Sequence, residues 1–435
     1  MTVLRKVAID AQILDTTMGG VSSHLAALVK SLGELDGPEY YYLVCAQENP
    51  NWLCACIGEN QEIVLGPARP ARQLVKRVFG KHWQRIWALG YTVASRTQTR
   101  FAASKRMPVG AVTDMSGYFE ALGVSLVHAF SQVYLRTSLR VIFNPHDLQH
   151  EHFPQFFTPE VLARRRMIYR TACQEAAVIV AASQFTKADV IQQYGIPWDK
   201  IFVIPFAPAT LVHSERDDVS RDDIASMYDL PGPFVLYPAA TWEHKNHLRL
   251  LEAIVLLRNE GMRINLVCTG RRVEPTWGML ARFVAESELQ DQVRFLDFVP
   301  GGDLRALYRA SDFVIAPSLF EQASGPMFEA WQEGTAVAAS NVTSIPDRAG
   351  NAALLFDPNS VMTIADALRT LWVDIDLRNQ LEQRGRARLQ QFTWEKTAKA
   401  YRALYRCVGG WSITEEDRYL LSLDWMSNRS NPHVC

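Results

Sequence analysis

The stretch FVLYPAATWEHKNHLRLLEAIVLLRNEGMRINLVCTG, residues 234–270, contains one complete unit of strand, loop, helix and strand. The apolar runs at 234–240 and 264–270 have the length and composition of buried strands, and the segment from His247 has helical apolar spacing. Two strands joined by a helical crossover run parallel in one sheet. The unit therefore predicts a parallel sheet that is covered by helices.

The same alternation extends in both directions from this unit. Toward the C-terminus, strands are expected at 293–299, 313–318 and 335–340, with helices near 277–288 and from about 326. Toward the N-terminus, strands are expected at 7–14, 40–46, 125–130, 140–145, 177–183 and 200–206. Short apolar strands that alternate with helices imply an α/β protein with two doubly wound, Rossmann-like parallel sheets.

The chain length and one polar stretch predict where the domains divide. The 435 residues suit two domains of about 200 residues each. The stretch 207–233, rich in charge, serine and proline, contains the expected linker. We expect an N-terminal domain over 1–208, a second domain over 209–395, and a C-terminal helix and tail over 396–435 that pack back on the first domain.

The amino-acid composition limits the classes of binding partner and the cellular compartment that can be expected. The 45 lysines and arginines nearly cancel the 46 aspartates and glutamates, so no global basic field predicts a nucleic-acid partner. The seven cysteines are scattered and odd in number, which suggests reduced thiols in the cytoplasm. No segment approaches the ~20 apolar residues that span a bilayer. We expect a cytoplasmic protein, with a peripheral position on the inner face of the cell membrane as an extension of that expectation.

Polar residues follow the strand at 234–240, just before a helix. Ligands of open parallel sheets bind outside the carboxyl ends of the strands. The free N–H groups at a helix start favour an anion, and Lys245 adds a positive charge there. This arrangement suits a diphosphate. The alternative is an exposed helix start with a solvated lysine, and the segment alone does not decide between the two.

A second polar loop follows the strand at 313–318. Gly325 permits close backbone approach, and Pro326 fits the first turn of a helix. Glu329 falls in that first turn, and Glu321 falls in the loop before it. Both carboxylates are natural hydrogen-bond acceptors for the hydroxyl groups of a sugar or ribose. The alternative is that both glutamates are solvated acids on the surface, which is the better interpretation for a pair of glutamates chosen at random.

These two loops resemble the retaining glycosyltransferases of family four. Glu321 and Glu329 enclose seven residues, as in that family's Glu-seven-Glu motif, and the sequence SLFEQASGPMFEAWQEGTAVAASNVTSIPDRAGNAALLFDP resembles its donor-site region. The resemblance covers residues 5 to 405 and implies the GT-B fold, in which two Rossmann-like domains face a central cleft. It also implies that the second domain binds a nucleotide sugar and the first an acceptor.

The resemblance implies a role for each residue of the donor side. Glu321 and Lys245 are the expected catalytic residues of the second domain: the carboxylate contacts hydroxyls of the donor sugar, and the lysine contacts the diphosphate. Glu329 is expected to bind the ribose. The remaining expected donor contacts are Gly19, Gly20, Arg271, Ser324 and Gly325. Arg271 is included among these contacts because Ala240 stands where many relatives have a phosphate-binding arginine. Arg272 is the alternative residue for that role.

Three residues of the first domain are expected at the cleft. His146 of the segment NPHD is expected to line it and to take part in catalysis, and Asp147 is a candidate contact for the acceptor. His128 ends an apolar strand and is also a candidate. A histidine at the end of a strand is more often hydrogen-bonded in the core than catalytic, and this is the alternative for His128.

The resemblance also implies the chemistry. The leaving phosphate oxygen takes the acceptor proton on one face of the sugar, so neither a protein nucleophile nor a metal is expected, and the sequence has no Asp-x-Asp after a strand. The form HKNH at 244–247 resembles mannosyltransferases, which makes GDP-mannose the first expected donor. A UDP-hexose donor and a non-catalytic sugar-nucleotide-binding protein are the alternatives. The expected acceptor is a glycan or a lipid-linked glycan in surface polysaccharide or glycolipid assembly.

A basic and aromatic segment lies within the first domain. Residues 63–113 contain no acidic residue, and apolar residues within 72–87 repeat at helical spacing. Such a helix is typical of a protein that lies on an anionic membrane. A helix packed in the core with a solvated basic face fits equally well, and the use of lipid-linked acceptors by relatives favours the membrane.

Overall fold

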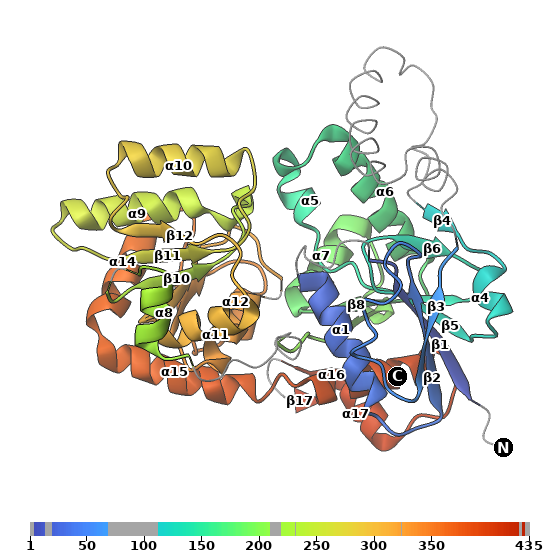
Figure 1. Cartoon of the computed structure of the whole chain (residues 1–435). Coiled ribbons are helices and arrows are strands. Elements are labelled where there is room, and N and C mark those ends of the chain that lie inside the picture. Colours follow the sequence, from blue (N-terminus) through green and yellow to red (C-terminus); the bar gives the residue numbers. More distant parts are fainter. Residues whose placement is uncertain are drawn as a thin grey trace, which may run out of the picture.

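The computed structural model of the chain describes residues 4–13, 20–67, 112–208, 219–230, 232–322, 324–425 and 429–430. Two α/β domains lie side by side, and the chain passes from the first to the second and then back (Figure 1). Each domain is built on one parallel sheet with helices on both faces. The predicted fold class is therefore confirmed.

The first domain contains a parallel sheet of seven strands in the order β3-β2-β1-β5-β7-β8-β9. The strands are β1 (Arg5–Ala11), β2 (Glu39–Cys45), β3 (Gln61–Leu65), β5 (Leu126–Ala129), β7 (Arg140–Phe143), β8 (Val178–Ala181) and β9 (Ile201–Val203). Its helices are α1 (Gly20–Gly33), α4 (Tyr118–Ala121), α5 (Gln149–His152), α6 (Pro159–Glu175) and α7 (Gln184–Tyr194), with single turns at η3 (Pro154–Phe156) and η4 (Trp198–Lys200). A separate pair, β4 (Val112–Asp114) and β6 (Tyr134–Arg136), is also parallel.

Alternation along each central strand places apolar side chains on both faces of this sheet. On β1, Val7 and Ile9 pack with Leu25 of α1. Ala8, between them, packs on the opposite face with Tyr169 of α6. Successive side chains of a strand point to opposite faces, so a strand that is buried on both must be apolar throughout. This is why the strands of the first domain appear as continuous apolar runs.

The second domain repeats the design with six parallel strands in the order β12-β11-β10-β13-β14-β15. The strands are β10 (Val235–Pro238), β11 (Leu266–Thr269), β12 (Val293–Phe295), β13 (Phe313–Ala316), β14 (Val337–Ser340) and β15 (Leu354–Phe356). The helices are α8 (Arg221–Met227), η6 (Glu243–Lys245), α9 (His247–Asn259), α10 (Thr276–Glu286), α11 (Gly301–Ala310), α12 (Gly325–Gln332), α13 (Ile345–Ala349), α14 (Val361–Val373) and α15 (Ile375–Leu389).

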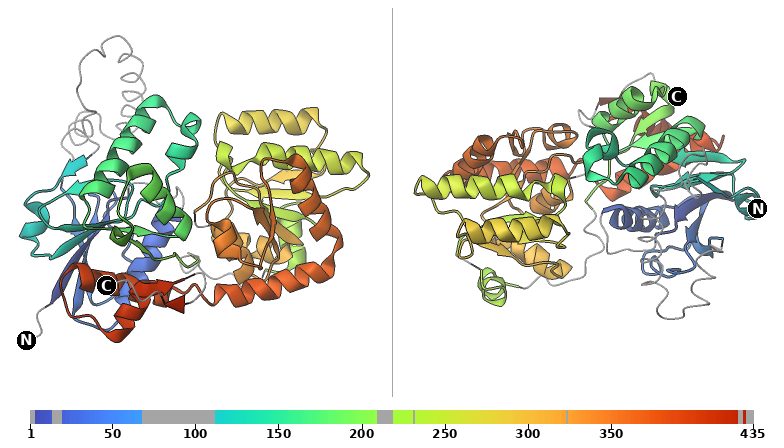
Figure 2. Two further views of the ribbon diagram at one scale, coloured as in Figure 1. Left: turned by 180° about the vertical axis from the view of Figure 1, so that it is seen from behind. Right: turned by 90° about the horizontal axis from the view of Figure 1, so that it is seen from above.

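The chain returns to the first domain through α16 (Trp394–Val408) and α17 (Glu415–Ser422), which lie against α1 and the first sheet (Figure 2). At the crossing, Trp394 donates a hydrogen bond of 2.5 Å to the carbonyl of Pro208, so the two chain crossings are tied together. Deeper along α16, Arg406 donates to both carboxylate oxygens of Glu39 at 2.8 and 3.1 Å, and to Asp417 at 2.9 Å.

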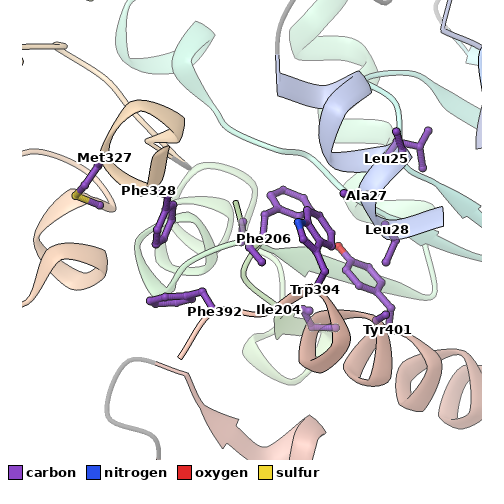
Figure 3. Close-up of a cluster of buried hydrophobic side chains, with 14 of the residues drawn as sticks. Leu25, Ala27, Leu28, Ile204, Phe206, Met327, Phe328, Phe392, Trp394 and Tyr401 are labelled. Carbon is purple, nitrogen blue, oxygen red and sulfur yellow. The ribbon is translucent and has the colours of Figure 1, made fainter. Parts of the chain in front are cut away.

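One apolar cluster continues from the first domain into the second. Leu25 and Leu28 of α1 lie on one side of it, Phe328 of α12 lies on the other, and Phe206 and Trp394 occupy the middle (Figure 3). The fully buried Arg348 of α13 crosses the same boundary. It donates hydrogen bonds to the carbonyls of Ala182 at 2.8 Å and of Phe206 at 3.4 Å.

The sequence did not predict β3, β15 or any structure after residue 409. The region after α16 contains α17 and a two-stranded antiparallel pair, β16 (Leu423–Asp424) and β17 (Arg429–Ser430). The sequence at the start of α17 does contain a pattern that marks the beginning of a helix. Thr414 and Asp417 form this pattern, a reciprocal capping box.

Candidate functional site

A cavity of about 210 Å³ lies between the two domains and takes its lining from both. The lining residues are Gly20, Val21, His24, Gln132, His146, Asp147, Gln149 and Phe206 of the first domain, and His244, Lys245, Phe320, Glu321 and Gln322 of the second. Most of them follow the carboxyl end of a strand, as expected for the ligand site of an open parallel sheet.

Two loops of the second domain meet on one wall of this cavity. Lys245 follows β10 and Glu321 follows β13, and these strands are neighbours at the point where the strand order reverses. The Nζ of Lys245 donates a hydrogen bond to Oε1 of Glu321, and the hydroxyl of Ser318 donates to the same oxygen at 2.9 Å. Only 18% of the lysine side chain and 14% of the glutamate side chain are exposed.

The charge states of this wall follow from burial and from the ion pair. Burial by itself raises the pKa of Glu321, but the charge and hydrogen bond of Lys245, together with the Ser318 hydroxyl, outweigh it and keep this pKa below its ordinary value. Burial and the charge of Lys245 lower the pKa of His244 to about 4. At neutral pH the wall therefore presents a carboxylate, an ammonium group and a neutral imidazole.

Helix α12 begins just beyond Glu321. Ser324 has a φ of 47°, in the left-handed region, and its buried hydroxyl has no hydrogen-bond partner in the described part of the chain. Gly325 is the first residue of the helix, and Glu329 lies one turn along it. The Tyr308 hydroxyl donates to Oε2 of Glu329 at 2.7 Å. These predicted donor residues adjoin the cavity in sequence but are not part of its lining.

The wall of the first domain contains two of its three predicted cleft residues. His146 has a φ of 61°, a conformation that costs a non-glycine residue of order 1–3 kcal/mol and is typical of functional sites. Its Nε2 lies 2.6 Å from the carbonyl of Phe130 and therefore carries the proton. Burial lowers the pKa of His146, so the ring is neutral. Asp147 follows it, and its Oδ1 accepts a hydrogen bond of 3.1 Å from the Gln149 N–H.

The structure does not bring His128 to the cavity. Its side chain is fully buried beneath α16, with Nδ1 2.7 Å from the Tyr405 hydroxyl and Nε2 2.8 Å from Oδ1 of Asn144. Burial lowers the pKa of His128 to about 4. The prediction of His128 as a cleft residue is therefore replaced by a structural role, because the returning helix covers the end of its strand.

The remaining predicted residues fall in different places. Arg271 is exposed and outside the cavity lining, and its carbonyl accepts a hydrogen bond of 3.0 Å from Thr241. Arg272 lies over the ring of Trp277 at 4.3 Å. Gly20 lines the cavity, whereas Gly19 and the basic segment 72–87 lie outside the described residues.

Sequence reasoning missed His24, Gln132, Gln149, His244 and Phe206 of the cavity lining. One signal was available, since His24 stands four residues after Gly20 and so faces the same side of α1. The ring of His24 stacks on Phe206 with centroids 4.6 Å apart. Burial, assisted by the nearby His146 and Arg348, lowers the pKa of His24 to about 3, so this imidazole is neutral as well.

Comparisons with known proteins define the class. The profile described as "Glycosyltransferase Family 4" matches residues 18–206, and the profile described as "Glycosyl transferases group 1" matches residues 232–374. Together they cover both domains and both walls of the cavity. The chain therefore belongs to the glycosyltransferases of family four, and it is an enzyme of the hexosyltransferase class.

Individual relatives agree with this assignment. O-antigen chain mannosyltransferase B of Escherichia coli is 29% identical over 61% of this chain and 71% of its own length. The serotype-specific mannosyltransferase WbdA of the same organism is 29% identical over 52% of this chain but only 28% of its own length. D-inositol 3-phosphate glycosyltransferase of Corynebacterium glutamicum is 28% identical over 57% of this chain and 61% of its own length.

Solved structures support the fold. Anabaena HepE in complex with UDP and glucose has a TM-score of 0.63 and 17% identity, covering 92% of this chain and 99% of that one. Sucrose-phosphate synthase from Thermosynechococcus elongatus has a TM-score of 0.66 and 18% identity, covering 93% and 99%. The two facing Rossmann-like domains are the GT-B fold.

Within the described residues, no group of three or more histidine, cysteine, aspartate or glutamate side chains is placed to hold a metal ion. None of the helices in the same residues is both long and apolar enough to cross a membrane.

Proposed function

We propose that the protein is a retaining glycosyltransferase that moves a hexose from a nucleotide diphosphate onto a glycan or lipid-linked acceptor. Mannose from GDP-mannose is the first candidate donor, and the process is surface polysaccharide or glycolipid assembly. The observation that carries the proposal is the Lys245 and Glu321 pair, which lies at the switch point of the second sheet and faces the cavity between the domains.

On the donor side, each predicted contact has a chemical reason. Lys245 offers an ammonium group to the diphosphate, and the first N–H groups of α12 offer further donors together with the positive end of the helix dipole. The unpartnered hydroxyl of Ser324 adds one more hydrogen-bonding group at the same helix start. Glu321 would then accept hydrogen bonds from the sugar hydroxyls and Glu329 from the ribose.

The reaction needs no nucleophile from the protein. The bond between the anomeric carbon and the phosphate oxygen breaks, and the acceptor oxygen attacks on the same face. The acceptor proton passes to the departing phosphate oxygen. Negative charge grows on that phosphate, and Lys245 and the start of α12 are fixed in place to stabilise it. His146 is neutral and its Nε2–H is held by the carbonyl of Phe130, so Nδ1 is the atom of this ring that can accept a hydrogen bond. We propose that this reaction proceeds without a metal.

The donor sugar is proposed from the relatives. Two E. coli relatives are named mannosyltransferases, and the form HKNH at 244–247, which leads into α9, is the sequence feature that favours mannose. Within this segment Lys245 faces the cavity, while His247 is buried against Tyr237. The segment thus places one lysine at the donor site and anchors it to the sheet.

The test is a thermal-shift screen against GDP, UDP, ADP and their hexose conjugates, with and without magnesium, because a ligand of the native state raises the midpoint. Stabilisation by GDP and GDP-mannose, followed by transfer of labelled mannose, supports the proposal. Stabilisation by a UDP series would replace the donor. Binding of a nucleotide without any transfer would favour a non-catalytic protein that binds a sugar nucleotide.

We also propose a cytoplasmic location with peripheral contact to the inner face of the membrane. The support is the basic, aromatic sequence of residues 72–87. Reversing the charges of Lys76, Arg77 and Lys81 is expected to reduce sedimentation with anionic phosphatidylglycerol vesicles. Unchanged sedimentation would remove the membrane contact and leave the transferase proposal intact.

A further inference from the structure

The first-domain wall of the cavity is polar but carries little positive charge. Among the described residues, the charged side chains that line the cavity are Asp147, Lys245 and Glu321. Lys245 and Glu321 neutralise each other, so Asp147 contributes the remaining formal charge. His24 and His146 on the same wall are neutral, because burial lowers the pKa of both. Among the described residues, the lining of the wall that faces the proposed donor site is therefore neutral to negative.

Two glutamines line the same cavity as this carboxylate. Gln132 follows β5, and its Oε1 accepts a hydrogen bond of 3.1 Å from Arg165. Because this bond occupies Oε1, the Nε2 amide group is the part of Gln132 that can donate a hydrogen bond to a ligand. Arg165 itself packs over the ring of Phe157 at 5.0 Å, which holds the guanidinium behind the amide.

Gln149 is the first residue of α5, and its backbone N–H holds Asp147 through the 3.1 Å hydrogen bond. A carboxylate only accepts hydrogen bonds, whereas an amide NH₂ group only donates them. A sugar hydroxyl does both, so neighbouring hydroxyls of one ring satisfy such a wall. A phosphate monoester offers acceptor oxygens and negative charge to the same carboxylate, and it is repelled.

We infer that the acceptor held by Gln132, Asp147 and Gln149 is the uncharged hydroxyl-bearing end of a glycan, not a phosphorylated sugar or cyclitol. This inference rests on the proposed function and specifies its acceptor class. Binding of the proposed donor would strengthen the selection against charged acceptors, because its diphosphate brings further negative charge to the opposite wall. The site then selects its acceptor by charge as well as by shape.

The experiment compares matched pairs of acceptors. Octyl glycosides of mannose, glucose and N-acetylglucosamine are each offered with their 6-phosphates, together with the nucleotide sugar that the thermal-shift screen selects. We expect at least one neutral glycoside to be extended, with a kcat/KM at least tenfold above that of its 6-phosphate. Equal or better transfer to a 6-phosphate would overturn the inference, and so would transfer to 6-phosphates by a protein that leaves every neutral glycoside unextended.

Variants assign the selectivity to the wall. Asp147→Asn and Gln149→Lys are expected to raise the ratio of phosphorylated to neutral transfer at least threefold, while Asp199→Asn, at an exposed acid of the same domain, leaves it unchanged. If all three variants keep the wild-type ratio, this wall does not select the acceptor. The proposed function fails separately, either through loss of nucleotide binding in the thermal-shift screen, which involves no acceptor, or through nucleotide binding without transfer to any acceptor, neutral or phosphorylated.

Discussion

Lys245 and Glu321, 76 positions apart in the chain, form an ion pair on the wall of the cavity between the two domains. Each follows one of two neighbouring strands, β10 and β13, so the sheet itself sets their separation. The proposed function gives this pair a role: the carboxylate would hold the ammonium group in position for the donor diphosphate.

The first prediction concerns this lysine. Lys245→Ala is expected to weaken donor binding or turnover at least tenfold, about 1.4 kcal/mol, because the diphosphate loses its cation. The measurement is the nucleotide-sugar Kd and kcat/KM. Lys399→Ala is the matched control, since Lys399 also forms ion pairs, with Glu395 and Glu416, but on α16 outside the cavity lining. Equal losses in both variants would refute a specific role for Lys245.

The second prediction concerns Glu329. Glu329→Gln keeps the size of the side chain but removes its charge, and we expect donor binding or turnover to fall at least tenfold if the carboxylate binds the ribose. Loss of the Tyr308 hydrogen bond is a separate effect, which Tyr308→Phe isolates. Full activity of Glu329→Gln would contradict the ribose assignment. An unchanged melting temperature excludes unfolding as the cause of a loss.

The third prediction concerns pH and His128. Its folded-state pKa of about 4 lies below the ordinary value of 6.5, so below pH 6.5 the unfolded chain binds the proton more readily than the folded protein. The free energy of unfolding should therefore fall as pH drops from 6.5 toward 4, by on the order of 3 kcal/mol from this residue. Urea unfolding at pH 7 and pH 5 covers about 1.5 of these pH units and should show about 2 kcal/mol of the loss.

His128→Gln provides the comparison for this pH effect. Glutamine can hydrogen-bond to Tyr405 and Asn144 but does not titrate. Other buried histidines, including His24 and His150, contribute in the same direction, so the variant should reduce the loss of stability without abolishing it. The same loss in the variant and in the wild type would show that His128 does not contribute.

The fourth prediction concerns the returning helix. Arg406 contacts Glu39 and Asp417, and each of these acidic side chains is only 2% exposed. Arg406→Leu removes the cation that pairs with the buried Asp417 and leaves Glu39 with Arg5 at 3.2 Å, and breaking such a buried ion pair typically costs about 3–5 kcal/mol. We expect a lower free energy of unfolding, measured by urea titration. Arg418→Leu, at an exposed position of α17, is the control and should change stability little.

The sequence alone predicted the two parallel sheets and the chemistry of the second domain. Strands buried on both faces leave continuous apolar runs, so the core strands of both sheets were recognisable. The positions of Lys245 and Glu321 after such runs made them candidates, because parallel strands end at one edge of a sheet. The resemblance of their segments to family four was what assigned donor-site roles to them and to Glu329. The edge strands β3 and β15, which are short and partly exposed, carry a weaker pattern and were missed.

Tertiary structure alone decided which further side chains join the predicted Gly20, His146 and Asp147 on the first-domain wall. His24, Gln132 and Gln149 come from three different elements, and no local pattern indicates that the fold brings them together. His128 shows the converse: its position at a strand end favoured a cleft residue, but α16 returns from the far end of the chain and covers it. Local periodicity records which face of an element is buried. Packing between segments that are far apart in sequence decides which distant segment buries that face and which side chains remain facing the cavity.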